Sequence, residues 1–222
     1  MPMSFRTSLP ESEFPRLPPI RYSDKILLLG SCFAENIGAR LQNLAYQLCI
    51  NPFGITYNPA SISHLLQRLA IEQPYAADEL FFDQRRGTWH SYDHHSRFTH
   101  AQADETLRHI NQDYAAGCHF YQHANVWLIT LGTAWVYSLQ EQPTYIVNNC
   151  HHQAANHFQR RRLSPEEAAQ YLYNTLAPAL HARPNLHVLL TVSPIRHLKD
   201  GFHDNHFQRR RLSPEEAAQY LY

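Results

Sequence analysis

The feature that most constrains the fold is a continuous apolar run that ends at a turn and is followed by a helical pattern. Lys25–Gly30 (KILLLG) is this run, and beyond it Phe33, Ile37 and Leu41 recur at helical spacing. An apolar run without alternation is typical of a strand buried on both faces, as in a parallel sheet. The segment therefore predicts a strand–turn–helix unit with Ser31 at the turn.

The same pattern recurs along the chain. Gln47–Pro59 predicts a short strand that runs into a loop, and residues 60–70 (ASISHLLQRLA) predict a helix. Asn125–Tyr137 is the strongest buried-strand pattern, and residues 186–197 (LHVLLTVSPIRH) predict another buried strand. Strands that alternate with helices indicate an α/β fold with a mainly parallel sheet. Active sites of such sheets lie beyond the carboxyl ends of the strands, where Ser31 is placed.

Residues from about 72 to 120 depart from this alternation and form an excursion rich in histidine and aromatic residues. Residues 81–100 predict a hairpin with its turn at Arg86-Gly87, and residues 103–117 predict a helix that Gly117 ends. Beyond it, residues 145–150 (YIVNNC) predict a shorter strand. A further helix begins after Ser164, because Ser164 suits the N-cap, Pro165 the first helical position, and two glutamates follow.

Length and charge limit the class of protein. A chain of 222 residues predicts a single domain, 1–222, and residues 1–22, with five prolines, predict an extended N-terminal arm. Lys+Arg 19 balance Asp+Glu 19, which argues against nucleic-acid and membrane-surface partners. The N-terminus lacks a signal-peptide pattern and no run approaches the roughly 18 apolar residues of a membrane span, so we expect a cytoplasmic protein with free thiols.

One segment of the chain occurs twice without change. NHFQRRRLSPEEAAQYLY stands at Asn156–Tyr173 and again at Asn205–Tyr222. Stacked repeats normally occur in threes or more, and the second copy ends within a helical pattern. We therefore interpret residues 205–222 as an artefact of the sequence record and expect the native continuation after Asn205 to be absent. A genuine tandem insertion is the alternative.

Ser31 is the first candidate for chemistry. A serine between a strand and a helix places its hydroxyl near the helix N-terminus, where backbone N–H groups favour developing negative charge. The same position is also the ordinary place of an N-cap serine, which leaves a structural role open. Cys32, the next residue, could have a lowered pKa near the helix N-terminus and act as a thiol nucleophile.

Five separated motifs, in order, resemble the GSCFA family, which is similar to the SGNH/GDSL-like hydrolases. They are KILLLGSCFAENIG, NPFGITYNP, TLGTAWVY, VNNCHHQ and TVSPIRHLKDG. The resemblance implies a flavodoxin-like (SGNH-type) three-layer sandwich that acts on esters with a serine nucleophile and no cofactor. It assigns Ser31 as nucleophile, the N–H groups of Ser31 and Gly54 to the oxyanion hole, and Asn51, Asn58 and Gly132 to substrate binding.

The chain departs from the superfamily pattern at two places. Ala134 stands where the superfamily has an oxyanion asparagine, so Asn149 is the candidate replacement, unless it only caps its own turn. His197 and Asp200, within SPIRHLKDG, are the candidate catalytic partners of Ser31, although His197 could instead be a strand-end histidine bonded to backbone. Asp200 and His203 match the superfamily's Asp-x-x-His pair but follow a strand too directly, so we expect the true pair beyond Asn205.

The leading hypothesis is a serine esterase or acyltransferase acting on a small or carbohydrate-linked ester. A non-catalytic ligand-binding protein that uses the same cleft is the alternative, favoured by Ala134 and by the missing base. The aromatic stretch Phe81–Phe98 could then stack on sugar rings. A third hypothesis, a metal-dependent hydrolase, depends on histidine clusters that lack the expected ligand spacing, so we expect no metal site. These histidines are His90, His94, His95, His151 and His152, near Asp93 and Cys150.

Overall fold

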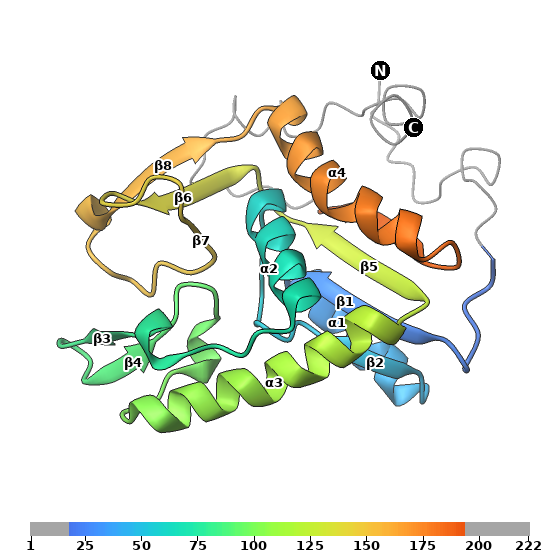
Figure 1. Cartoon of the computed structure of the whole chain (residues 1–222), viewed down its shortest axis with the longest axis horizontal. Coiled ribbons are helices and arrows are strands. Elements are labelled where there is room, and N and C mark those ends of the chain that lie inside the picture. The colour runs from blue at the N-terminus through green and yellow to red at the C-terminus, as the bar shows by residue number, and fades with distance from the viewer. Residues whose placement is uncertain (1–17, 194–222) are drawn as a thin grey trace, which may run out of the picture.

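The computed structural model describes residues 18–193 of the chain, and at its centre is a four-stranded parallel sheet. The strand order is β2-β1-β5-β9, and every neighbouring pair is parallel. Figure 1 labels β2, β1 and β5 of this sheet. The predicted α/β fold with a mainly parallel sheet is therefore confirmed. The bounds are β1 Lys25–Gly30, β2 Gln47–Ile50, β5 Val126–Leu131 and β9 His187–Val192.

Helices cover both faces of the sheet, which gives the three layers of a flavodoxin-like sandwich. Because side chains alternate along β1, Ile26 and Leu28 pack against α1, whereas Leu27 and Leu29 join the cluster formed with the other helices. Each buried leucine or isoleucine contributes about 1.5–3 kcal/mol. The helices are α1 Cys32–Asn43 on one face and α2 Pro59–Ile71, α3 Ala103–His123 and α4 Pro165–Ala182 on the other.

The start of α4 follows the predicted capping chemistry. Ser164 Oγ accepts the Glu167 N–H at 3.1 Å, and the Glu167 carboxylate accepts the Ser164 N–H at 2.7 Å. Together they form a capping box that satisfies two otherwise unpaired backbone donors. The predicted N-cap at Ser164, with Pro165 in the first turn, is confirmed.

The predicted end of a helix at Gly117 is wrong. Helix α3 continues through Gly117 to His123. A Cβ atom at this position would lie 2.9 Å from Leu69 Cδ2 and 2.9 Å from Pro52 Cβ. The glycine is needed because α3 packs closely against α2 and the loop after β2, not because the helix ends.

The segment Asn125–Tyr137 does not form one strand. It divides into β5 and β6 (Trp135–Leu139), and β6 belongs to a separate antiparallel sheet of order β7-β6-β8. Strands β7 (Ile146–Val147) and β8 (Phe158–Arg162) complete this sheet. Strand β9 is less buried than predicted, because Leu190 and Val192 are exposed.

The remaining described elements belong to the excursion and its surroundings. The predicted hairpin is confirmed as β3 (Phe81–Asp83) paired with β4 (Thr88–His90). Three short 3₁₀ helices connect the larger elements: η2 Ala77–Glu79, η3 Ser96–Phe98 and η4 Ala155–His157. Within residues 18–193, no helix is long and apolar enough to cross a membrane.

Two predicted segments fall wholly or mostly outside the described residues. Of the N-terminal arm, only residues 18–22 are described, and they are exposed. The first copy of the duplicated segment forms β8 and the first part of α4, whereas the second copy, 205–222, lies outside the described residues.

Candidate functional site

Ser31 lies directly after β1 and caps α1. Its Oγ accepts the Phe33 N–H at 3.3 Å and lies 3.2 Å from Thr130 Oγ1, at the end of neighbouring β5. The Ser31 N–H donates to Thr130 Oγ1 at 2.8 Å. The residue is 3% exposed, so its hydroxyl is held within the protein at the positive end of the α1 dipole.

The loop after β2 is bound to this turn through Asn51. The Asn51 side-chain oxygen accepts the Gly30 N–H at 2.8 Å, and its backbone N–H donates to Leu28 O at 2.9 Å. Asn51 adopts a left-handed conformation, with φ of 44°. Further along the loop, the Thr56 N–H donates to Gly30 O at 3.0 Å. The loop therefore binds both the N–H and the carbonyl oxygen of Gly30, the residue before Ser31.

The structure places the two predicted backbone donors of the oxyanion hole, the N–H groups of Ser31 and Gly54, in existing hydrogen bonds. In addition to the Ser31 N–H, the Gly54 N–H is engaged, because it donates to Asn51 O at 2.7 Å. Asn149 closes its own turn, since its side-chain oxygen accepts the His151 N–H at 2.8 Å and its N–H donates to Tyr92 O at 3.1 Å. The Ser31 and Gly54 N–H groups are therefore already bonded in the structure, and the Asn149 side chain is oriented by its own turn.

The predicted substrate-binding residues have different surroundings. Asn58 caps α2, where its side-chain oxygen accepts the Ser61 N–H at 2.8 Å. Gly132 donates its N–H to Tyr57 O at 2.7 Å and lies against the Tyr57 ring. Only Asn51, of these three, is bonded to the Gly30–Ser31 turn. The candidate base residues His197 and Asp200, together with His203, lie outside the described residues.

A buried carboxylate in the excursion organises a second polar cluster. Asp93 is 2% exposed, and its Oδ2 accepts the Tyr75 hydroxyl at 2.7 Å and lies 3.0 Å from His64 Nε2. The Tyr145 hydroxyl donates to Oδ1 at 3.0 Å. Burial alone would raise the pKa of Asp93, but the His64 hydrogen bond and charge, with smaller effects of His94 and Tyr75, lower it to about 2.

Sequence reasoning missed the partners of Asp93. His64 lies on α2 and Tyr145 precedes β7, so the contacts join residues far apart in the chain. Burial would lower the pKa of His64, but its hydrogen bond to Asp93 and the carboxylate charge raise it. A lone Asp within an aromatic stretch was the only signal in the sequence, and it does not identify which residues pair with it.

Other histidines of the clusters identified in the sequence lie within hydrogen-bond distance of neighbouring polar groups. His151 Nε2 lies 2.8 Å from Ser91 O, and its Nδ1 lies 3.1 Å from His90 Nδ1. His94 Nδ1 lies 2.9 Å from Ser91 Oγ. Among residues 18–193, no group of three or more His, Cys, Asp or Glu side chains is arranged to hold a metal ion.

The aromatic side chains of the hairpin pack on one another. Phe81 stacks on Tyr92 at 4.2 Å between ring centroids and on His90 at 5.3 Å. Phe82 is exposed, and its ring lies 5.2 Å from that of Trp89. Most of this aromatic surface is thus used within the hairpin and its neighbours.

Acid should destabilise the folded protein between pH 6.5 and 4.5, because two buried histidines must remain neutral. Burial lowers the pKa of His94 to about 3 and that of His151 to about 4. An unfolded histidine titrates near pH 6.5, so the unfolded chain binds more protons in this window. Each histidine therefore lowers the free energy of unfolding by about 2–3 kcal/mol at pH 4.5 relative to pH 7. Urea unfolding at pH 7, 5.5 and 4.5 measures this loss.

The variant His94→Gln is the matched control, because glutamine does not titrate. Its free energy of unfolding should fall less steeply with acid than that of the unmodified protein. The pKa of His64 is raised in the folded protein, so its contribution to the free energy of unfolding is full below pH 6.5 and is lost as the pH rises. His64 therefore does not add to the destabilisation by acid. Equal slopes for the two proteins would contradict the role given to His94.

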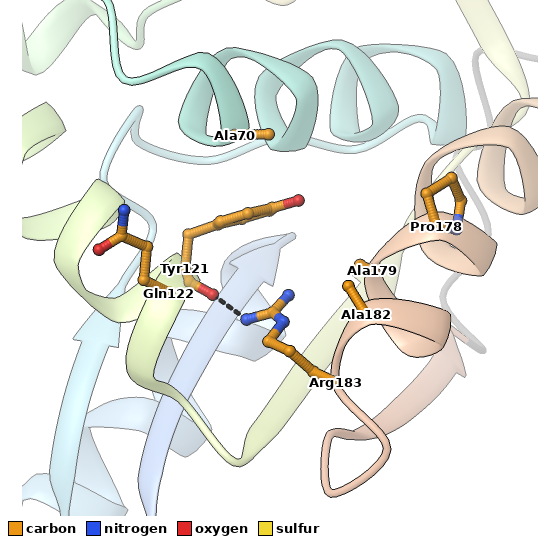
Figure 2. Close-up of a pocket in the computed structure, with 7 residues that line it drawn as sticks. All are labelled: Ala70, Tyr121, Gln122, Pro178, Ala179, Ala182 and Arg183. Carbon is orange, nitrogen blue, oxygen red and sulfur yellow. Dashed lines mark hydrogen bonds between the residues drawn. The ribbon is translucent and has the colours of Figure 1, made fainter.

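A cavity of about 380 Å³ lies away from the Ser31 turn, between the carboxyl-terminal ends of α2, α3 and α4 (Figure 2). Its walls include Ala70, Pro178 and the Tyr121 ring. Arg183 Nη1 donates to the Tyr121 carbonyl oxygen, in the last turn of α3, and the guanidinium stacks near the Tyr121 ring. A cation suits a helix C-terminus, so Arg183 has a structural role, and the lining contains no serine, cysteine, histidine or carboxylate.

Comparisons with known proteins give one match. The GSCFA family model matches residues 25–213, which include the Gly30–Ala34 pentapeptide and the Ser31 turn. No curated protein and no solved structure matches the chain. Because the match covers most of the chain, from β1 past β9, the protein belongs to the GSCFA family.

Proposed function

We propose that the protein is a serine ester hydrolase or acyltransferase of the SGNH type, with Ser31 as its nucleophile. The observation that supports this most is the position of Ser31 Oγ, buried at the N-terminus of α1 and directly after the central strand β1. The dipole of this 12-residue helix favours the negative charge that develops on oxygen during attack. A small or carbohydrate-linked ester is the proposed substrate class.

The proposed reaction proceeds through an acyl-enzyme. Ser31 Oγ attacks the ester carbonyl carbon while its proton passes to a base, and the carbonyl oxygen becomes an oxyanion. The C–O bond to the alcohol then breaks, and the leaving alkoxide takes the proton from the base. Water attacks the acyl-enzyme to release a carboxylic acid, or a second alcohol attacks to give a new ester.

The base that accepts the Ser31 proton is proposed from the sequence motif. Among the described residues, Ser31 Oγ has hydrogen bonds only with Phe33 N and Thr130 Oγ1, and neither group is a base at neutral pH. We keep His197 as the proposed base and Asp200 as the residue that orients it, in accordance with the SPIRHLKDG motif.

A non-catalytic ligand-binding protein is the second candidate. One observation favours it: the Ser31 and Gly54 N–H groups already have partners. A protein that only binds would not need these groups for an oxyanion. In this case an acylated sugar would bind with saturation and would be recovered unchanged.

The Ser31→Ala variant tests the nucleophile. We expect a full-length form of the protein to hydrolyse p-nitrophenyl acetate and to gain one phosphonyl group from a fluorophosphonate, as measured by intact mass. Ser31→Ala should lose the labelling and at least about 10³-fold of the hydrolysis, because no covalent intermediate can form.

Two further variants make the test specific. Ser138→Ala, on β6, is a serine-to-alanine control that should retain full labelling and activity. Cys32→Ala separates a hydroxyl from a thiol nucleophile, since loss of activity in this variant but not in Ser31→Ala would assign the reaction to Cys32, which is exposed. A wild-type protein that neither reacts nor hydrolyses but binds an acylated sugar would support the binding candidate instead.

A further inference from the structure

The loop after β2 contains two buried polar atoms without hydrogen-bond partners among the described residues. They are the side-chain nitrogen Nδ2 of Asn51 and the hydroxyl oxygen Oγ1 of Thr56. Each residue is 1% exposed. A buried polar group without a partner is costly to the folded state, and most buried polar groups in folded proteins are hydrogen-bonded.

Both residues are fixed against the residue that precedes Ser31. Asn51 Oδ1 accepts the Gly30 N–H, and the Thr56 N–H donates to Gly30 O. Because Asn51 Oδ1 and Nδ2 share one carbon atom, the bond to Gly30 also fixes the amide nitrogen at this turn. The Asn51 amide is therefore held at the Ser31 turn, and the Thr56 hydroxyl belongs to a residue whose backbone is bonded to the same turn.

Every other polar group of Asn51 is engaged. Its N–H donates to Leu28 O, and its carbonyl oxygen accepts the Gly54 N–H and the Arg97 guanidinium at 2.9 Å. The left-handed backbone of Asn51 adds a conformational cost. Nδ2 is therefore the one polar group of Asn51 that a ligand could use.

The backbone donors expected for an oxyanion are not available. The Ser31 N–H donates to Thr130 Oγ1, and the Gly54 N–H donates to Asn51 O. The side-chain oxygen of Asn149 orients that side chain within its own turn, and Ala134 has no polar side chain. The two unpartnered side-chain groups of the loop are therefore candidate donors beside the turn.

We propose that Asn51 Nδ2 and Thr56 Oγ1 donate hydrogen bonds to the carbonyl oxygen of the ester as it becomes an oxyanion. This inference rests on the proposed Ser31 chemistry and replaces its backbone donors with side-chain donors. A donor already fixed before the reaction stabilises the developing charge without reorganisation, and loss of one such donor commonly costs about 10²–10³-fold in rate.

The variants Thr56→Val and Asn51→Asp test the two donors. Valine keeps the shape of threonine and its backbone bond to Gly30 but lacks the hydroxyl. Aspartate keeps an acceptor for the Gly30 N–H and tolerates the left-handed backbone, but it lacks the amide donor. With p-nitrophenyl acetate, we expect kcat to fall about tenfold or more for Thr56→Val and about 10²-fold or more for Asn51→Asp, with KM changed less than threefold.

Rescue and charge controls distinguish this role from a structural one. Thr56→Ser restores a hydroxyl and should recover most of the activity lost in Thr56→Val. Asn174→Asp, at an exposed position of α4, makes the same chemical change away from the turn and should retain full activity. The rate of Ser31 labelling by a fluorophosphonate should fall in parallel with kcat, while thermal melting confirms that each variant is folded.

The outcomes distinguish failure of the donor assignment from failure of the proposed Ser31 esterase. Labelling and hydrolysis at wild-type rates in both Thr56→Val and Asn51→Asp would overturn the donor assignment and leave the Ser31 nucleophile in place. A full-length wild-type protein that fails to react would overturn the esterase itself. If Asn51→Asp does not fold, the comparison of Thr56→Val with Thr56→Ser still decides the assignment, because equal activity of these two variants contradicts it.

Discussion

Asp93→Ala should destabilise the protein by about 3–5 kcal/mol, a large part of the 5–15 kcal/mol typical of a folded domain. The substitution removes the acceptor of the Tyr75 and Tyr145 hydroxyls and the partner of His64. Both hydroxyls then lose their acceptor in a site where water has little access, because the Asp93 side chain is 3% exposed. Urea denaturation at pH 7 measures the loss.

Asp93→Asn and His64→Gln separate the contributions within this cluster. Asparagine keeps the shape and one acceptor oxygen, so we expect a smaller loss than for alanine. His64→Gln leaves both tyrosine hydroxyls paired with Asp93, and His64 is partly exposed, so its loss should be smaller still. Removal of the carboxylate charge should also lower the pKa of His64, which NMR titration of Asp93→Asn can measure. Equal stability of all four proteins would contradict the importance of the cluster.

Gly30→Ala should prevent the protein from folding stably. Gly30 has φ of 136°, which an L-residue with a side chain rarely adopts. A Cβ atom there would lie 2.8 Å from Thr130 N and closer still to Thr130 O and Oγ1. Because backbone atoms of β5 cannot move away without breaking the sheet, we expect a loss of at least about 4 kcal/mol.

Gly87→Ala is the matched control for this prediction. Gly87 also has positive φ, 64°, but no atom lies within 4 Å of the position of a Cβ atom. Only the conformational cost remains, about 1 kcal/mol. Thermal melting should therefore show a small shift for Gly87→Ala and little or no folded protein for Gly30→Ala. Similar melting temperatures for the two variants would show that the contact with Thr130 is unimportant.

The central sheet was predictable because its strands carry a strong local pattern. The apolar run Lys25–Gly30 and the helical spacing after Ser31 gave β1 and α1 without knowledge of their neighbours. The second sheet was not predictable in this way. Strand β8 reads FQRRR, and its side chains after Phe158 are exposed, so no apolar pattern marks it as a strand. Its pairing with β6 is a tertiary effect that local propensity does not contain.

The site was only partly predictable for a related reason. The position of Ser31 between a strand and a helix follows from local sequence, and the structure confirms that position. Which backbone donors are free depends instead on contacts across the chain, such as that of the Ser31 N–H with Thr130. The role of Asn51 in binding Gly30 is likewise a long-range contact. A sequence motif names residues of a site but not the hydrogen bonds that are already formed there.

The bond between Ser31 and Thr130 also determines when the site can assemble during synthesis. The two residues are 99 positions apart, and β1 pairs with β5 as well as with nearby β2. At a translation rate of about 5–20 residues per second, β1 waits roughly 5–20 s for this second neighbour. During that interval the nascent chain carries an apolar strand with one unpaired edge. The N-terminal part of the chain is therefore where a chaperone would have the largest effect on yield.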